Sequence, residues 1–417
     1  MPLPDKAALR QIENSLLREE LQFDEIWEKE EHQKLFDNLN DEQKTVYDAV
    51  LDSVDNGKGT LFFVYGAGGT GKTFIYRTII SRLRSQKRIV LPVASSGIAA
   101  LLLPGGRTAH SRFKIPLNVH DTSTCDIKQG TMLAELLAST ELIIWDEAPM
   151  AHRQTFETLD RTLKDLMSLN DETAAEKTFG GKTVLLGGDF KQILPVVQQG
   201  GRPETVLATL SRSYLWPSCN VYTLTHNMRL CPSEIEFAEW ILKVGKGTAT
   251  RRNPNGLAGE DRILIDNALM LQSTGDPLEQ ISEAAYPQFQ NSFLDHEYLK
   301  ERAILTPRNE TVHEVNAFLL SKIPGQTTEY LSSDSIGIDS APGTDWQSLY
   351  PVEYLNSLEF PGLPSHRLDL KVGAPVMMLR NINQKEGLCN GTRLIITQLG
   401  KRVLEAEIMT GPNPGKK

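Results

Sequence analysis

The sequence contains few cysteines, and none is spaced like part of a metal-binding or redox motif. The four are Cys125, Cys219, Cys231 and Cys389, and no two of them form a C-x-x-C pair. Zinc sites and disulfide frameworks need paired cysteines, so we expect neither in this chain. A reducing compartment is favoured for the same reason.

Long apolar runs are also missing. No stretch approaches the roughly 20 apolar residues of a membrane-spanning helix, and residues 1–6 show no signal-peptide pattern. We therefore expect no membrane partner. The net charge of −9 excludes a basic coat over the whole surface, although a local cationic channel for nucleic acid needs only a few residues. The 417 residues are enough for two or three domains.

The most specific motif is a glycine-rich loop that fits the pattern G-x-x-x-x-G-K-[ST]. Its members are Gly66, Ala67, Gly68, Gly69, Thr70, Gly71, Lys72 and Thr73. Glycines let the backbone turn several N–H groups toward one point, and a following helix adds the positive end of its dipole. The apolar run 61–65 predicts a strand before the loop, and 74–83 predicts a helix after it. The pattern predicts a nucleotide site in which Lys72 reaches the phosphates and Thr73 binds Mg²⁺.

Polar side chains follow three further apolar runs. Asp146 and Glu147 end the predicted strand 142–145, which is the arrangement of a magnesium-binding acid followed by a water-activating acid. Gln192 follows the predicted strand 183–187, and its amide suits a γ-phosphate. Arg229 follows the predicted strand 221–224 and is a candidate to neutralise phosphate charge, with a surface arginine as the alternative. We expect all four side chains at the same edge of a parallel sheet.

Gln43 has two interpretations. It lies three residues after Asn40, as in a capping box that begins a helix, and spacing alone favours this role. Its amide could instead face an adenine edge, because it both donates and accepts hydrogen bonds.

Two segments could contact a nucleic-acid strand. Ser95 and Ser96 follow the predicted strand 89–93, where hydroxyls suit either phosphate contacts or helix capping. Residues 106–114 mix cations, hydroxyls and an aromatic ring, and include His110 and Phe113. That mixture suits phosphate contacts with Phe113 under a base, although a solvated loop is the simpler interpretation of the segment alone.

The remainder of the chain predicts a second α/β unit and a small β unit. Residues 1–38 predict a helical, solvated lead-in, in which apolar residues such as Ile26 and Trp27 alternate with acids. Residues 303–306 predict a strand, and 310–320 predict the helix after it. Residues 371–381 and 392–396 predict strands of the small β unit. We expect domains at 39–230, 231–372 and 373–417.

In their order along the chain, these segments resemble the Pif-type (petite integration frequency) DNA helicases, in the RecD-like branch of helicase superfamily one. Among these helicases, the chain resembles in particular the version encoded by plant genomes and Helitron transposons. The resemblance covers nearly all of 39–410 and is most specific at 66–73, 95–100, 142–150, 187–195, 216–217 with 224–230, 303–309, and 370–381 with 390–392. It implies a P-loop NTPase with a RecA-like parallel-sheet domain, a second, incomplete RecA-like domain and a small β accessory domain.

The resemblance also implies residue roles. Gln43 would recognise adenine, Gln192 and Arg229 would contact the γ-phosphate of ATP, and Mg²⁺ would be held by Thr73 and Asp146. The residues implied to hold single-stranded DNA are Ser95, Ser96, His110, Phe113, Thr306 and Asn309. The family moves 5′ to 3′ and unwinds duplex junctions in repair, recombination or telomere maintenance. We expect a monomer in the nucleus, with the mitochondrion as the alternative.

Two family motifs that follow this region do not occur in the sequence, including the second-domain arginine that completes the ATP site. We therefore expect a truncated chain that binds Mg-ATP but hydrolyses it poorly, since loss of such an arginine costs about 10³–10⁵ in rate. The alternatives are an inactive nucleotide- or DNA-binding remnant and a P-loop ATPase unrelated to DNA.

Overall fold

The computed structural model describes residues 14–169, 171–252, 261–263, 265–271, 275–335, 351–358, 364–383, 386–410 and 413–417. The chain divides into two compact units, Met1–Leu264 and Ile265–Lys417. This division falls after the helix α11 (Ile235–Gly245), which composition assigned to the second domain. A Cβ built at Gly245 would lie 3.6 Å from Cδ of Lys191, so the end of this helix lies beside the segment that follows β5 within the same unit. The domain limits expected from the family stay predictions.

The first unit is built on a six-stranded sheet in the order β3-β2-β4-β5-β1-β6. All neighbouring strands are parallel, for example Phe62 beside Leu185 and Val93 beside Trp145. The strands are β1 (Leu61–Gly66), β2 (Val90–Ala94), β3 (Arg107–Thr108), β4 (Leu142–Asp146), β5 (Thr183–Gly188) and β6 (Cys219–Leu224). The five strands that the apolar runs predict are confirmed, and their carboxyl ends meet at one edge of the sheet.

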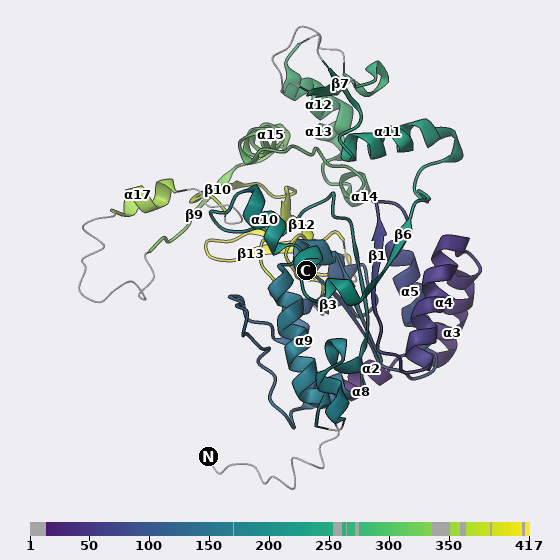
Figure 1. Ribbon diagram of the computed structural model, residues 1–417. Coiled ribbons are helices and arrows are strands. Elements are labelled where there is room, and N and C mark those ends of the chain that lie inside the picture. The colour runs from purple at the N-terminus through teal and green to yellow at the C-terminus, as the bar shows by residue number, and fades with distance from the viewer. Residues whose placement is uncertain are drawn as a thin grey trace, which may run out of the picture. The chain divides into compact units, whose positions relative to one another are not determined.

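Both faces of this sheet are buried, which explains why its strands are apolar at successive positions. Phe62 and Val64 of β1 pack with helices α4 (Asp41–Asp55) and α5 (Lys72–Arg84). Phe63 points to the opposite core, where α9 (Arg153–Met167) packs. The two layers are visible on either side of β1 and its neighbours in Figure 1. The other helices are α2 (Ser15–Leu21), α3 (Glu25–Phe36), α6 (Gly97–Leu101), α7 (Ala109–Phe113), α8 (Met132–Ser139) and α10 (Arg202–Ala208), and a hairpin of β7 (Thr250–Arg252) and β8 (Asp261–Ile263) follows α11.

The lead-in is helical as predicted from residue 15 onward, and two of its apolar residues are more exposed than two of its acids. Ile26 and Trp27 are 72% and 57% exposed, whereas Glu20 and Glu28 are 6% and 2% exposed. The inversion has an electrostatic reason, because the carboxylate of Glu20 binds buried arginines on α5 and α7. Residues 1–13 lie outside the described part of the chain.

The second unit contains short antiparallel sheets and helices. Strands β9 (Thr328–Leu331) and β10 (Arg367–Leu370) form one pair. Strands β11 (Pro375–Met377), β12 (Arg393–Leu399) and β13 (Leu404–Ile408) form the small β unit, which confirms its prediction. The helices are α12 (Pro277–Ala285), α13 (Phe289–Ser292), α14 (His296–Lys300), α15 (Asn309–Lys322) and α17 (Val352–Ser357), and the core includes Tyr286, Phe289, Leu299, Ile323, Ile395 and Met409.

One predicted strand of the second unit is wrong. The segment 303–306 has no regular secondary structure, and Leu305 is 92% exposed. A parallel strand needs neighbours that bury both its faces, and the described residues of this unit pair only in antiparallel fashion. The helix predicted after it is confirmed as α15.

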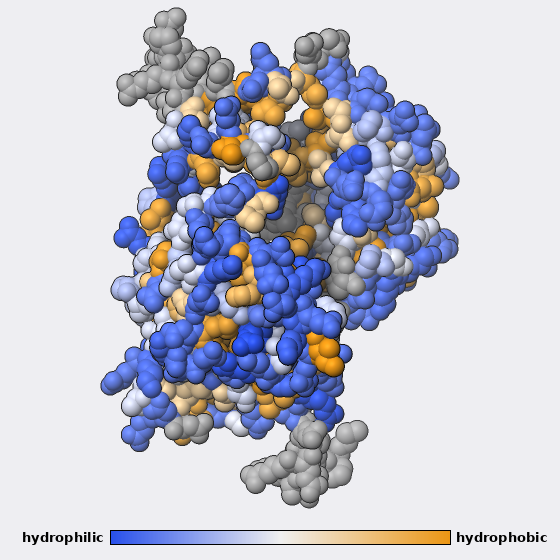
Figure 2. Space-filling view, turned by 90° about the vertical axis from the view of Figure 1, so that its right-hand side faces the viewer, coloured by the Kyte–Doolittle hydropathy of each residue, from blue (hydrophilic) through white to orange (hydrophobic). Residues whose placement is uncertain are grey.

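On the face shown in Figure 2, apolar side chains of the described residues occur in groups among polar ones. Within the described residues, no helix combines the length and the apolar composition that crossing a bilayer requires.

Candidate active site

The glycine-rich loop connects the end of β1 to the start of α5, as its sequence predicts. Gly69 and Gly71 have φ angles of 88° and 83°, in the left-handed region that favours glycine. A Cβ at Gly71 would lie 2.4 Å from Nε2 of Gln43, so a larger residue there would also displace that amide. The loop therefore requires glycine both for its backbone angles and for its contact with Gln43.

Lys72 lies at the centre of this loop. Its side chain is buried, and its ammonium group donates hydrogen bonds to the carbonyl oxygens of Gly66 at 2.6 Å and Ala67 at 3.4 Å. Lys72 is also the first residue of α5, where the unpaired N–H groups and the helix dipole favour an anion. The loop thus combines backbone donors with one ammonium group, which is the chemistry of a phosphate site.

Asp146 ends β4 beside this loop. The hydroxyl of Thr73 hydrogen-bonds to its carboxylate, and the charge of Lys72 acts on it. Burial, followed by the negative charge of Glu147, nevertheless raises the pKa of Asp146 to about 6. A buried carboxylate next to a hydroxyl is a pair of hard oxygen ligands, which fits Mg²⁺. The structure therefore brings together the lysine and the acid that the nucleotide prediction requires.

Glu147 has an unusual backbone conformation. Its φ angle is 51°, in the left-handed region that non-glycine residues rarely adopt, and its N–H donates to Oδ1 of Asp146 at 2.9 Å. Such a conformation costs of order 1–3 kcal/mol and persists where surrounding contacts impose it, often at functional sites. The hydrogen bond joins the two acids into one rigid turn.

Gln192 and Arg229 also reach the loop, from segments that follow β5 and β6. A Cβ at Gly68 would lie 4.0 Å from Nε2 of Gln192, and one at Gly69 would lie 3.1 Å from Cβ of Arg229. The backbone N–H of Met228 donates to the carbonyl of Gly69 at 2.7 Å. These contacts place both predicted γ-phosphate residues at the loop.

Gln43 makes the capping box that its spacing predicts. Its N–H donates to Oδ1 of Asn40 at 2.9 Å, and its Oε1 accepts from the N–H of Asn40 at 3.0 Å. The other end of the same amide donates to the carbonyl of Thr70 at 3.3 Å. One buried side chain thus caps α4 and contacts the phosphate loop, and its role toward adenine stays a prediction.

Sequence reasoning missed two residues that hold this site together. Asn227 accepts hydrogen bonds at Oδ1 from the N–H groups of Arg229 and Leu230 at 2.9 and 3.2 Å, an Asx turn that its residue type could have indicated. Glu42 accepts from the N–H of Thr225 at 2.8 Å. Hydrogen bonding from the Thr225 hydroxyl lowers the pKa of Glu42. No local pattern could have indicated Glu42, because its partner lies 183 positions away.

The residues of the first unit that are predicted to contact single-stranded DNA also have structural roles. Ser96 caps α6 by accepting from the N–H of Ala99 at 3.3 Å, and Ser95 accepts from Nε1 of Trp145 at 3.0 Å. His110 is partly buried, which lowers its pKa. The prediction that Phe113 stacks under a base is wrong: its side chain is 0% exposed and packs near Trp145 in the core.

The two predicted DNA residues of the second unit lie at the start of α15. The hydroxyl oxygen of Thr306 accepts from the N–H of Arg308 at 3.4 Å, and Asn309 is exposed at the first position of the helix. Their contact with single-stranded DNA stays a prediction.

Comparison with known proteins assigns the chain to a family. Residues 38–255, more than half of the chain, match the family model of the PIF1-like helicases. The chain belongs to the PIF1-like helicase family. Residues 353–399 also match the model of the 2B domain of the DNA helicase Pif1, a range that includes the second unit's strands β10, β11 and β12.

Curated relatives of this PIF1-like chain come from distant organisms. It is 28% identical over 344 residues to the ATP-dependent DNA helicase Pif1 of Psychrobacter sp., covering 82% of this chain and 44% of the relative. It is 24% identical over 362 residues to the ATP-dependent DNA helicase PIF1 of Homo sapiens, covering 86% and 46%. The chain thus spans less than half the length of these relatives.

Solved structures share the fold. A Pif1 helicase structure describing DNA unwinding at forked duplex DNA by two coordinating helicases has a TM-score of 0.58 at 22% identity, covering 90% of this chain and 75% of that one. The Bacteroides Pif1 helicase in complex with ADP-AlF3 and single-stranded DNA has a TM-score of 0.57 at 22% identity, covering 90% and 73%. The fold class is therefore that of a RecA-like α/β P-loop protein.

Proposed function

We propose that this chain is the motor region of an ATP-dependent DNA helicase that moves 5′ to 3′ on single-stranded DNA and opens duplex junctions. The observation that supports the proposal most is convergence on one loop. Lys72, the Thr73–Asp146 pair, Gln192 and Arg229 come from four separate segments and meet around residues 66–73. Family membership and the relatives' names agree with this assignment.

Each residue has a proposed task in phosphoryl transfer to water. The ammonium of Lys72 exchanges its two loop carbonyls for phosphate oxygens. Thr73 and Asp146 hold Mg²⁺, which when bound neutralises phosphate charge. Glu147 orients the attacking water and accepts its proton. Gln192 and Arg229 stabilise charge at the terminal phosphate.

The proposed nucleic-acid contacts come from both units. Ser95, Ser96 and His110 follow β2 and β3, at the sheet edge that carries the nucleotide site. Asn309 is the first residue of α15, and Thr306 lies three residues before it. The solved relatives' descriptions name single-stranded and forked DNA as what those proteins bind. We propose the same class of partner here, with Phe113 excluded from direct stacking. We propose that the protein acts in the nucleus, with the mitochondrion as the alternative. The proposed process is DNA repair, recombination or telomere maintenance.

Coupling between the two sites tests the proposal. The affinity for a fluorescent single-stranded oligonucleotide is measured with and without Mg²⁺ and a non-hydrolysable ATP analogue, in the wild type and in K72A. We expect the analogue to change the wild-type affinity roughly 5–100-fold and to leave K72A unchanged. If the analogue leaves the oligonucleotide affinity of both proteins unchanged, the motor assignment is contradicted. If neither protein binds the oligonucleotide, the proposed DNA partner is contradicted.

A further inference from the structure

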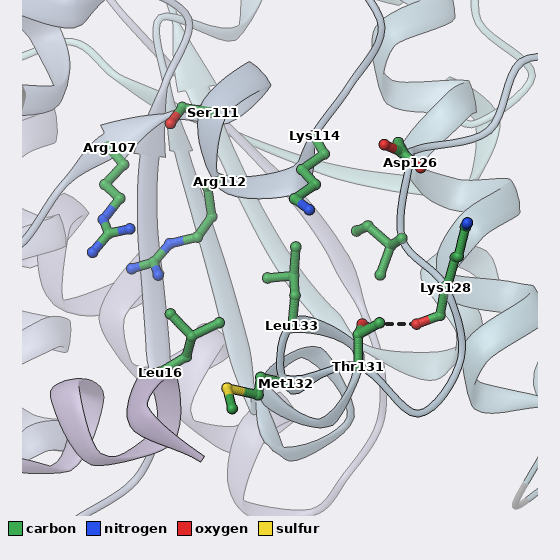
Figure 3. Close-up of a pocket in the computed structure, with 11 residues that line it drawn as sticks. Leu16, Arg107, Ser111, Arg112, Lys114, Asp126, Lys128, Thr131, Met132 and Leu133 are labelled. Atoms are coloured by element: carbon green, nitrogen blue, oxygen red, sulfur yellow. Dashed lines mark hydrogen bonds between the residues drawn. The ribbon is translucent and has the colours of Figure 1, made fainter. Parts of the chain in front are cut away.

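A cationic pocket lies away from the nucleotide loop, between α7, α8 and the lead-in helix α2. Its volume is about 540 Å³, and its lining includes Arg107, Ser111, Arg112 and Lys114. Figure 3 shows the side chains of Arg107, Arg112 and Lys114 extending from β3 and α7 toward the same space, which α2 borders at Leu16. Among the described residues that line it, Asp126 is the single acid.

Two of these cations already hold oxyanions. Nη2 of Arg107 lies 2.7 Å from Oε1 of Glu19 on α2. The guanidinium of Arg112 pairs with Glu20, the next residue of the same helix. Each arginine thus pairs with one carboxylate through Nη2, and a guanidinium binds phosphate oxygens with the same donors.

Arg112 has donor capacity beyond this pair. It is 4% exposed, and its Nε makes no hydrogen bond within the described part of the chain. A buried guanidinium with an unused donor, on the wall of a polar pocket, is suited to a further oxygen ligand. Lys114 and Ser111 are exposed beside it and supply an ammonium and a hydroxyl.

The carboxylates of α2 are held at this pocket by a short helix. The helix has seven residues, and its apolar contacts come from the partly buried Leu16 and Leu17. Glu20 is shared, since Arg84 also lies 4.0 Å from its other oxygen. Burying an ion pair removes both charges from water, and the free energy that this costs offsets much of their attraction. Another oxyanion can therefore compete for these arginines.

We propose that this pocket binds backbone phosphates of single-stranded nucleic acid, and that Glu19 and Glu20 compete with those phosphates for Arg107 and Arg112. The proposal rests on the proposed function in one respect, that the protein binds a single strand. It adds a second contact region on the outer side of α7, whose occupancy depends on α2. Displacing the two carboxylates would leave four cations, Arg107, Arg112, Lys114 and Lys128, along the lining of the pocket.

The test compares salt dependence of oligonucleotide binding in four proteins without nucleotide: wild type, E19Q, K114A and E25Q. E25Q is the matched control, because Glu25 lies in the same lead-in and pairs with Lys87 at 3.4 Å, outside the pocket lining. Fluorescence anisotropy gives affinity at several salt concentrations, and circular dichroism melting confirms that each variant is folded.

We expect E19Q to bind a single strand roughly 3–10-fold more tightly than E25Q, with a logarithmic salt slope steeper by about 0.7 for each phosphate gained. The logarithmic salt slope of K114A should be shallower than that of the wild type by a similar amount. If E19Q matches E25Q, or K114A keeps the wild-type slope, the pocket proposal is overturned while single-strand binding stands. If none of the four proteins binds a single strand, both the pocket and the DNA partner are overturned, and Mg-ATP binding remains a separate measurement.

Discussion

The carboxylate of Glu42 accepts a 2.8 Å hydrogen bond from the backbone N–H of Thr225, four residues before Arg229. It also accepts a longer bond, at 3.4 Å, from the N–H of His226. On the other side of the segment, Met228 is bound to the phosphate loop through Gly69. The stretch that carries Arg229 is therefore fixed at two points, and Glu42 is a positioning residue for it.

Replacing Glu42 should loosen this stretch. We expect E42A to lower the ATP turnover rate roughly tenfold while the KM for ATP changes less than threefold, because the phosphate loop remains intact. D41A is the matched control, since Asp41 is an exposed acid in the same helical turn. Steady-state kinetics give the turnover rate and the KM for ATP of both variants. Equal turnover rates for E42A and D41A would show that Glu42 does not position Arg229.

The same contact predicts a dependence of stability on pH. Hydrogen bonding lowers the pKa of Glu42 below its ordinary value of 4.5. A carboxyl with a lowered folded-state pKa stabilises the fold above its unfolded pKa, and this contribution is lost as the pH falls through the folded-state value. Wild type should therefore lose more stability than E42Q between pH 5 and more acid conditions, as measured by urea unfolding. Parallel pH profiles would contradict the assigned hydrogen bond.

Gly71→Ala should abolish nucleotide binding. The new Cβ would meet Nε2 of Gln43 at 2.4 Å, and the φ of 83° is strained for alanine. G57A is the control, because Gly57 has a φ of 59° but nothing within 4 Å of a built Cβ. We expect G57A to lose about 1 kcal/mol of stability and to keep Mg-ATP affinity in isothermal titration calorimetry. Full binding by G71A would mean that the loop tolerates the clash.

Gln43 should determine base preference as well as helix capping. We expect Q43A to reduce the preference for ATP over GTP roughly tenfold, since the amide donor and acceptor are lost. N40A removes the reciprocal cap and should cost about 1 kcal/mol of stability without changing that preference. Competition binding with both nucleotides separates the two effects. An unchanged preference in Q43A would show that Gln43 caps the helix and contacts Thr70 without selecting the base.

Phe113 should behave as a core residue. We expect F113A to destabilise the fold by about 3–5 kcal/mol, while F113L keeps most of the stability and binds single-stranded DNA like wild type. The side chain is fully buried, so a base cannot reach it in this conformation. A selective loss of DNA affinity in F113L, with unfolding unchanged, would restore the stacking role that its sequence context suggested.

Much of the first unit was predictable because its signals are local. Runs of apolar residues give the strands, and the spacing of Gly71, Lys72 and Thr73 gives the loop between β1 and α5. Parallel pairing then places Asp146 at the same edge of the sheet as the loop. Each inference needed only neighbours in sequence and the geometry of a parallel sheet.

The wrong predictions, and the features that no sequence pattern indicated, concern residues whose environment depends on distant partners. Glu20 is of the second kind, because it is buried beside Arg112, 92 positions later, and helical periodicity cannot indicate that pairing. Phe113 looked like a nucleic-acid aromatic beside cations, whereas α7 turns it into the core next to Trp145. Residues 303–306 have strand-like composition, but the described second unit offers them no parallel neighbour. Composition gives local propensity, and tertiary context decides the outcome.

The most direct test of the nucleotide site is Mg²⁺-dependent ATP binding by isothermal titration calorimetry. Wild type, K72A and D146N are compared with and without Mg²⁺. We predict saturable binding of ATP by the wild type that strengthens with Mg²⁺, weakens at least tenfold in K72A, and loses its Mg²⁺ dependence in D146N. Equal binding by all three proteins, or none by the wild type, would contradict a shared magnesium–nucleotide site at Lys72 and Asp146.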